Sequence, residues 1–180
     1  MLCLKKGGYG MRRILIVGCC GAGKTTLSRE LGEILRIPVY HLDRYFWKPG
    51  WIEESRENFD AALAKLLQGD AWIMDGNYGR TFPERLKYAD TVIFLKYPRS
   101  LCLRRTLKRY WNYRGRTRPD LTEGCPERLN FEFLRYIWTY NRRMLPRMEA
   151  YLKEAGSGCR LHVFDHPERT EEFLRCLKRK

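Results

Sequence analysis

The stretch RILIVGCCGAGKTTLSRELGEILR, residues 13–36, decides the fold of this chain. It opens with RILIV, a short apolar run rich in β-branched residues, which is typical of a buried strand in a parallel sheet. Its second half, TLSRELGEILR, repeats leucine and isoleucine at helical spacing. Between them, GCCGAGKT (18–25) satisfies the pattern G-x-x-x-x-G-K-[ST]. Strand, glycine loop and helix in this order predict a phosphate-binding loop, or P-loop.

The loop also predicts how a nucleotide would be held. Glycines let backbone N–H groups turn inward around phosphate oxygens, and the helix N-terminus adds the positive end of its dipole. We expect Lys24 to reach the β- and γ-phosphates of ATP and the Thr25 hydroxyl to ligate Mg²⁺. The residues expected to bind the nucleotide are Gly18, Gly21, Ala22, Gly23, Lys24, Thr25 and Thr26.

Four more short apolar runs, each typical of a strand, follow along the chain at 38–42, 71–75, 91–95 and 159–164. Segments with helical spacing alternate with them. These helices are expected from Ser55, as cap, to about Gln68, onward from Pro98, from about Pro126 to Lys153 with a candidate kink at Pro146, and from Pro167 to Lys180. Residues 43–51 are expected to be a loop with a Pro-Gly turn. The alternation predicts an α/β P-loop NTPase with a doubly wound, five-stranded parallel sheet.

Composition limits the protein to one domain. The 180 residues, 44% apolar and 13% aromatic, suffice for a single core, which we place in residues 11–180 after a flexible tail, 1–10. No run of about 18 apolar residues could span a bilayer, and the first residues lack the features of a secretory signal. Seven cysteines without a Cys-x-x-Cys pair favour reduced thiols, and the three histidines show no metal-like spacing. We therefore expect a cytoplasmic protein without a membrane partner, whose formal charge of +14 favours anionic partners.

Several classes of P-loop protein lack their signatures here. The sequence has no Asn-Lys-x-Asp to select guanine and no Leu-Ser-Gly-Gly-Gln of a transporter ATPase. The chain is also too short for the two-lobed core of a helicase. A small ATP-dependent kinase or an ATP-binding regulator remains.

Two aspartates stand at strand ends, where doubly wound folds bind ligands. Asp75 ends the run 71–75, and we expect it to hold Mg²⁺ directly or through water. Asp43 follows the run 38–42 and is either a residue that faces the phosphoryl acceptor or a turn cap. Gly76, Asn77 and Tyr78 are expected to form the wall opposite the P-loop, with Asn77 either bound to the acceptor or fixing a turn.

Aromatic residues cluster just after Asp43, at Tyr45, Phe46, Trp47 and Trp51. They either stack on a planar acceptor, for which Trp47 is the chosen residue, or form the core of a small helical flap. Arg80 and Arg142 are candidates to pair with an anionic group of the acceptor.

From Lys96 to Arg118 there are nine basic residues and no acid, and the stretch RYWNYRGRTRP (109–119) interleaves them with aromatic rings. Such a segment is either a lid that closes over phosphates or a nucleic-acid face. Because no nucleic-acid-binding signature accompanies it, we favour an arginine-rich lid over about 109–125, with Arg114 binding the nucleotide. Weak non-specific binding of polyanions at low salt is expected in either case.

The order of these features resembles the adenylate kinase and shikimate kinase group. More narrowly, HLDRYFWKPGW (41–51), WIMDGNYGRT (72–81) and RGRTRPDLTEGCPERL (114–129) are similar to the bacterial DNA topology modulation proteins. The resemblance implies ATP binding and a kinase-type activity without naming the acceptor. It also implies that Asp43 touches the acceptor hydroxyl and that Arg118 touches the transferred phosphate.

The function expected from the sequence is an Mg·ATP-dependent phosphotransferase that acts on a small hydroxyl compound or a nucleotide. Lys24, Asp43 and Arg118 are the expected catalytic residues, with ATP and Mg²⁺ as cofactors. Two alternatives share these residues: an ATP-dependent regulator that binds DNA, and an ATPase without an acceptor.

Overall fold

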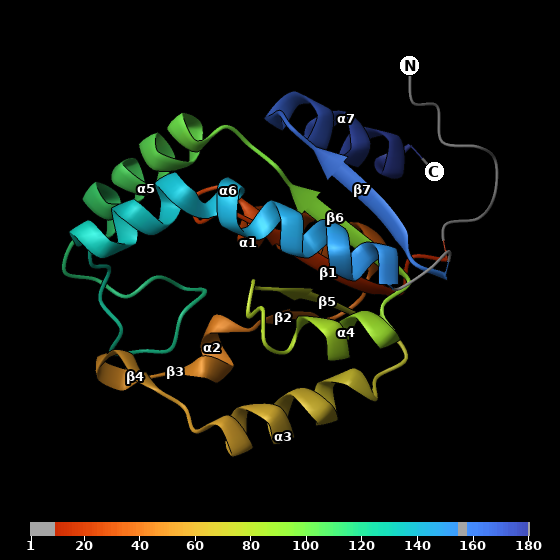
Figure 1. The fold of residues 1–180 in the computed structure, drawn as a ribbon, viewed down its shortest axis with the longest axis horizontal. Helices are drawn as coiled ribbons and strands as arrows, with labels where there is room; N and C mark the ends of the chain where they lie inside the picture. The colour runs from red at the N-terminus through yellow and green to blue at the C-terminus, as the bar shows by residue number, and fades with distance from the viewer. Residues whose placement is uncertain (1–9, 155–157, 180) are drawn as a thin grey trace.

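A five-stranded parallel sheet organises the computed structural model, which describes residues 10–154 and 158–179 (Figure 1). The strand order is β2-β5-β1-β6-β7. The strands are β1 (Arg13–Gly18), β2 (Val39–His41), β5 (Trp72–Asp75), β6 (Thr91–Leu95) and β7 (Arg160–Phe164). The expected doubly wound fold is confirmed, while the expected tail lies outside the described residues apart from Gly10.

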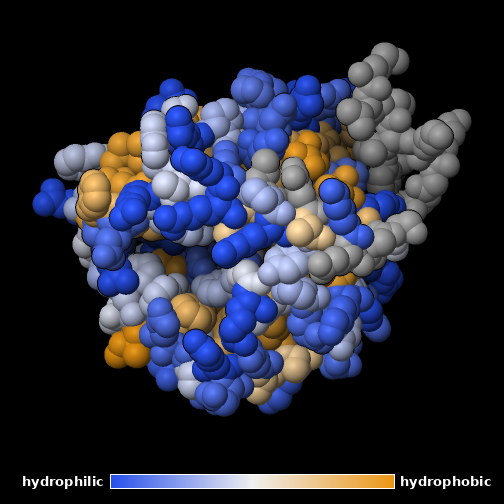
Figure 2. Space-filling model, in the orientation of Figure 1, coloured by the Kyte–Doolittle hydropathy of each residue, from blue (hydrophilic) through white to orange (hydrophobic). Residues whose placement is uncertain are grey.

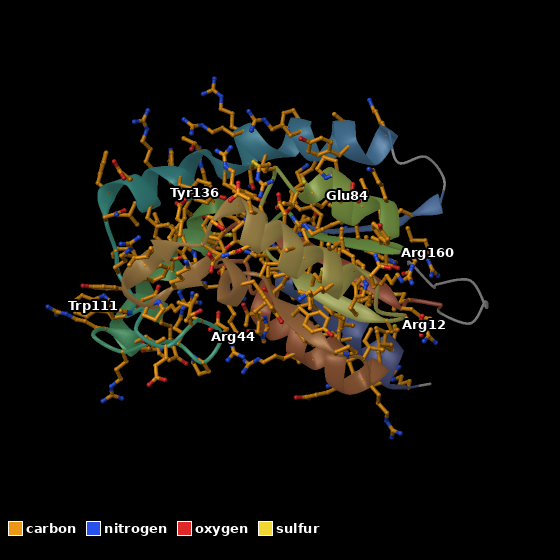
Figure 3. The ribbon with its side chains drawn as sticks, turned by 90° about the horizontal axis from the view of Figure 1, so that it is seen from below. Arg12, Arg44, Glu84, Trp111, Tyr136 and Arg160 are labelled. Atoms are coloured by element: carbon orange, nitrogen blue, oxygen red, sulfur yellow. The ribbon has the colours of Figure 1, made fainter. Side chains whose placement is uncertain are left out.

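Helices cover both faces of this sheet (Figures 1 and 3). Helices α1 (Lys24–Leu35) and α7 (Pro167–Lys178) contact each other on one side, and α4 (Phe82–Tyr88) and α6 (Phe131–Glu154) lie on the other. Two more helices, α3 (Arg56–Leu67) and α5 (Arg99–Tyr113), lie farther out, α3 against α2 and α5 against α6 (Figure 1). The apolar side chains of β1, β5 and β6 are almost fully buried between these layers. None of the helices in the described ranges has the length and apolar character to cross a membrane.

The expected cap of α3 is present, since Ser55 Oγ accepts a hydrogen bond from the Asn58 amide at 3.1 Å. Three other expectations were wrong in detail. Residues 43–53 are not a plain loop but α2 (Asp43–Phe46), the turn η1 (Pro49–Trp51) and a hairpin of β3 (Trp47–Lys48) with β4 (Ile52–Glu53). These elements are too short to show a hydrophobic period in the sequence. Their stability comes from tertiary packing.

The other two differences concern the helices α4 and α6. Helix α4 was not predicted, since its seven residues span only two turns. Helix α6 begins at Phe131 and not near Pro126, because residues 126–130 return from a loop that pairs Glu127 with Arg116. Asn130 then caps α6 by accepting the Phe133 amide at 2.8 Å. Pro146 lies within α6.

The P-loop packs directly against α5. Gly21 has a φ of +80°, and a Cβ atom there would overlap the carbonyl oxygen of Cys102 and crowd the hydroxyl of Thr106. Only glycine combines this left-handed backbone with so close an approach. The contact anchors the basic helix α5 to the loop.

We predict that Gly21→Ala lowers the free energy of unfolding by about 2–4 kcal/mol, because backbone strain adds to overlap with a fixed carbonyl. Gly115→Ala is the matched control: its φ is +72°, but nothing lies within 4 Å of the added methyl group. It should cost only about 1 kcal/mol. Urea unfolding measures both, and equal losses would contradict the packing argument.

Candidate active site

A cleft of about 830 Å³ opens at the carboxyl ends of the sheet strands. Figure 2 shows the hollow between hydrophilic side chains of the upper and lower halves of the molecule. This is where doubly wound sheets bind ligands. Of the residues predicted from the sequence, the cleft is lined by Gly21, Ala22, Gly23, Lys24, Thr25, Thr26, Asp43, Trp47, Asp75, Gly76, Asn77 and Arg118.

The P-loop forms one wall of the cleft. Lys24 Nζ donates to the carbonyl oxygens of Gly18 and Cys19, at 2.9 and 3.2 Å, so its charge lies over the loop. Gly18 is not part of the cleft lining, but its amide donates to Asn77 Oδ1 at 3.1 Å. The loop thus joins β1 to the segment that follows β5.

Asp75 is held firmly at the end of β5. Its Oδ2 accepts the Ser28 hydroxyl at 2.5 Å and lies 2.6 Å from His41 Nδ1, and the residue is 5% exposed. His41 had no role in the sequence analysis, because its partner lies 34 positions away. Thr25 and Asp75 supply the hard oxygen atoms that Mg²⁺ prefers.

Those two residues suit a metal ion held mainly by phosphate oxygens and water. Among the described residues, no group of three or more His, Cys, Asp or Glu side chains is arranged to hold a metal ion. The donor set therefore fits a nucleotide-bound Mg²⁺ and not an ion held by the protein alone.

Asp43 begins α2 and faces the cleft. Its Oδ1 accepts the hydroxyl of Tyr78 at 2.6 Å. Burial, and the adjacent Asp43 carboxylate, raise the pKa of Tyr78 well above its ordinary value, so the hydroxyl stays protonated and donates. Tyr78 is itself fixed between the rings of Phe46 and Phe59, at 4.9 and 5.2 Å. Tyr78 therefore positions the carboxylate.

A buried arginine organises the loop after β5. Arg85 is fully buried, and its guanidinium donates to the carbonyl oxygens of Gly76, Asn77 and Tyr78 at 3.1, 2.7 and 3.1 Å. Burial lowers the pKa of Arg85 to about 9, while the three carbonyl oxygens favour its charged form. Nothing in the sequence distinguishes this arginine from an exposed one, because its acceptors are backbone atoms.

Asn77 links the P-loop to α6, a role that differs from the turn considered from the sequence. Its Oδ1 accepts both the Gly18 amide and the Tyr140 hydroxyl, the latter at 2.9 Å. It therefore ties the P-loop to α6 while still lining the cleft.

Residues 43–53, here called the flap, use their aromatic side chains in both expected ways: some face the cleft and one packs in a core. Trp47 and Trp51 line the cleft with ring centroids 5.3 Å apart. Phe46 instead packs against Phe59 and Tyr78 in the core of the flap. The flap thus presents two indole rings to the cleft.

The expected lid over about 109–125 is not one loop, because residues 109–113 belong to α5. Residues 114–130, here called the lid loop, dock on this flap and roof the cleft. The Gly50 amide donates to the Gly124 carbonyl at 2.8 Å, and Trp51 Nε1 donates to the Pro126 carbonyl at 2.9 Å. Arg44 bonds the carbonyl of Pro119, and Figure 3 shows Arg44 beside this loop. The lid loop and the flap form one continuous cover.

The nine basic residues from Lys96 to Arg118 separate into two sets. Arg105, Arg109 and Arg118 line the cleft. The other six are exposed: Lys96, Arg99, Arg104, Lys108, Arg114 and Arg116. A single charged run in the sequence therefore serves two surfaces.

The cleft arginines of the lid carry acidic partners that the sequence analysis missed. Arg118 lies 2.9 Å from Asp120 and 2.7 Å from Glu127, and Arg109 lies 2.8 Å from Glu127. The Glu127 side chain is only 3% exposed. The available signal was that acids resume directly after residues 96–118, the stretch that holds the nine basic residues.

Besides Gly18, three predicted residues lie outside the cleft lining. Arg80 forms a half-exposed ion pair with Asp60, at 2.6 Å. Arg114 lies 5.9 Å from the ring of Trp111, and Arg142 is exposed on α6. Their roles at the site stay predictions.

The sheet, the loop and the cleft define a P-loop protein with the architecture of the small kinases. Residues 14–123 match the family model AAA_18, described as an AAA domain, and the chain belongs to this family. No curated protein matches the sequence significantly.

Solved structures share the fold at low identity. A shikimate kinase from Bacteroides thetaiotaomicron is 18% identical over 93% of this chain and 96% of the other, with a TM-score of 0.55. A shikimate kinase from Acinetobacter baumannii in complex with shikimate is 20% identical over 93% and 91%, with a TM-score of 0.60. A gluconokinase from Sinorhizobium meliloti 1021 is 14% identical over 94% and 90%, with a TM-score of 0.50. At these identities the likeness establishes the fold.

Replacing Arg85 tests whether it organises the loop. We predict that Arg85→Met lowers the free energy of unfolding by about 3 kcal/mol or more, because three carbonyl oxygens lose their donor in a buried site. The matched control is Arg80→Met, which breaks a half-exposed ion pair and should cost less than about 1 kcal/mol. Chemical denaturation compares them, and an unchanged Arg85→Met midpoint would refute the role.

Proposed function

We propose that the protein binds Mg·ATP and transfers the γ-phosphate to a hydroxyl group of a small or nucleotide acceptor. One observation carries the proposal: a P-loop and an aspartate oriented by a half-buried tyrosine face the same cleft. Phosphoryl transfer needs those two parts, one to hold the phosphates and one to orient the attacking hydroxyl.

The nucleotide end extends from the P-loop toward α5 and α7. Arg105 Nη1 lies 3.4 Å from the Ala22 carbonyl, and its guanidinium lies 5.7 Å from the ring of Tyr97. Pro167 and Thr170 continue the lining on this side. The P-loop amides and Lys24 would hold the phosphates, with the base and ribose toward this end.

Thr25 and Asp75 would hold Mg²⁺, which neutralises charge on the phosphates when bound. Arg118 and Arg109 would then stabilise charge that develops on the transferred group. Both are already positioned by Glu127, whose buried carboxylate fixes the two guanidinium groups in the roof of the cleft.

The acceptor end lies under the flap. Asp43 would orient the acceptor hydroxyl and accept its proton. Trp47 and Trp51 offer flat apolar surfaces, which favour a planar compound such as a nucleoside or nucleotide. Arg128 lines this end and lies 4.6 Å from the Trp51 ring, so we propose it as a nearer partner than Arg80 or Arg142 for an anionic group.

A DNA-binding regulator is the second candidate, supported by the six exposed basic residues outside the cleft. Trp111, which is 67% exposed, lies among them at the outer end of α5 (Figure 3). The resemblance to DNA topology modulation proteins belongs to this candidate. The acceptor end favours the kinase over the regulator, because DNA binding does not require an aspartate oriented toward the cleft.

We predict that Asp43→Asn reduces acceptor phosphorylation by roughly 10²-fold or more, because the amide cannot take a proton. Binding of ATP should persist, since Asp43 belongs to the opposite wall from the P-loop. The measurement is a screen of nucleosides, nucleotides and hydroxylated metabolites for acceptor-dependent release of ADP.

Lys24→Ala is the control for the nucleotide half, because it removes the charge at the β- and γ-phosphates. It should abolish turnover and weaken ATP binding. Wild-type turnover by Asp43→Asn would make Asp43 a turn residue, and ADP release that ignores every acceptor would favour the ATPase.

We further predict that DNA binding is non-specific. Affinity for labelled oligonucleotides should fall steeply as salt rises and should not depend on their sequence, because released counterions drive it. Fluorescence anisotropy over a salt series measures this. Nanomolar, sequence-dependent binding at about 0.15 M salt would instead support the regulator.

A further inference from the structure

We propose that Asp120 is a magnesium-sensing carboxylate, which makes docking of the lid loop depend on the metal and not on ATP alone. The inference rests on the proposed binding of Mg·ATP. It adds a third protein oxygen to Thr25 and Asp75, supplied from the lid.

The position of Asp120 carries the inference. Its Oδ2 lies 3.5 Å from Thr25 Oγ1, the hydroxyl expected to ligate Mg²⁺, although the two residues are 95 positions apart. Its other contact is Arg118 Nη1 at 2.9 Å, and its side chain is 16% exposed. The carboxylate therefore stands between the metal-binding hydroxyl of the P-loop and the phosphate-binding arginine of the lid.

Asp75 is linked from the sheet to the backbone of the same residue, Thr25. The Ser28 hydroxyl lies 2.5 Å from Asp75 Oδ2 and 3.0 Å from the carbonyl oxygen of Thr25. Thr25 is thus connected to one carboxylate of β5 through Ser28 and to one of the lid directly. Carboxylate oxygens are the ligands that Mg²⁺ takes in proteins, either directly or through its retained waters.

The negative charge of Asp120 would oppose docking of the lid loop when phosphates enter without Mg²⁺ and favour docking when Mg²⁺ is bound. Phosphates that enter without Mg²⁺ would meet a carboxylate at short range, and the repulsion would work against docking. With Mg²⁺ held at Thr25, the same carboxylate faces positive charge, and docking is favoured. Without a nucleotide, Asp120 neutralises Arg118 and keeps the loop in place.

The alternative is that Asp120 only pairs with Arg118 to fold the lid loop. If that were its whole role, replacing Asp120 would weaken docking of the lid loop equally with and without ligands. Under the proposal, the replacement changes how strongly Mg²⁺ promotes docking. Glu123 is a matched control, because it is an exposed acid of the same loop, outside the cleft lining.

The experiment follows hydrogen exchange of amides 114–127 in the full chain, without ligand, with a non-hydrolysable ATP analogue in EDTA, and with the analogue plus Mg²⁺. In the wild type and in Glu123→Gln, Mg²⁺ should slow exchange by about tenfold beyond the analogue alone. In Asp120→Asn, the analogue alone should slow exchange nearly as much, and Mg²⁺ should add little. Asp120→Glu keeps the charge and should retain the response.

A second measurement titrates Mg²⁺ into each protein saturated with the analogue. Asp120→Asn should raise the concentration at half-effect by about tenfold, and Glu123→Gln should not. Displacement of a fluorescent nucleotide first establishes binding. If the wild type binds no nucleotide, the proposed function fails and this inference with it. If nucleotide binds and Asp120→Asn or Asp120→Glu contradicts the expected magnesium response, only the inference is overturned.

Discussion

The backbone of residues 18–23 turns through three glycines with positive φ, and the elements around the cleft pack on this turn. Its amides can converge on phosphate only if no side chain intervenes, which leaves the loop backbone open to close contact with its neighbours. The carbonyl of Cys102 lies against Gly21, and Asn77 accepts the Gly18 amide. The Arg85 guanidinium donates to the carbonyl oxygen of Asn77. The hydroxyl of Tyr140, a residue of α6, donates to the Asn77 side chain. The requirement of phosphate binding thus determines where α5, α6 and the β5 loop lie.

Charged residues are treated differently inside the cleft and on the outer surface. Inside the cleft, Arg109 and Arg118 are matched by Glu127 and Asp120, because cations at low exposure are costly without partners. Outside it, six basic residues of the same run remain exposed to solvent, where a charge needs no partner. The net charge of +14 is therefore not a property of the nucleotide site alone. One sequence segment therefore supplies basic residues both to the cleft and to the exposed surface.

The family and the solved structures establish the fold, but they leave the acceptor open, since folds of this type host many reactions. The residues that would contact the acceptor in the proposed function lie in the flap. Trp47 and Trp51 face the cleft, the lid loop bonds Trp51 and Gly50, and Tyr78 supports both Phe46 and Asp43. In the proposed function, a flap joined to the lid loop in this way would link acceptor binding to closure over the phosphates. Acceptor specificity would then depend on the aromatic flap, and phosphate binding on the P-loop.

The sequence by itself determined the sheet, the P-loop and the strand-end aspartates, because periodicity and loop patterns are local properties that survive without knowledge of the fold. It could not determine that Tyr78 bonds Asp43 or that His41 bonds Asp75, since these pairs meet only when separate strands become neighbours. Nor could it separate the nine basic residues into cleft and surface, a distinction made by the way α5 and the lid loop pack. Arg85 and Asp120 look like ordinary surface residues in the sequence. Only tertiary structure places one among buried carbonyls and the other beside Thr25, because burial and proximity arise from contacts between distant segments.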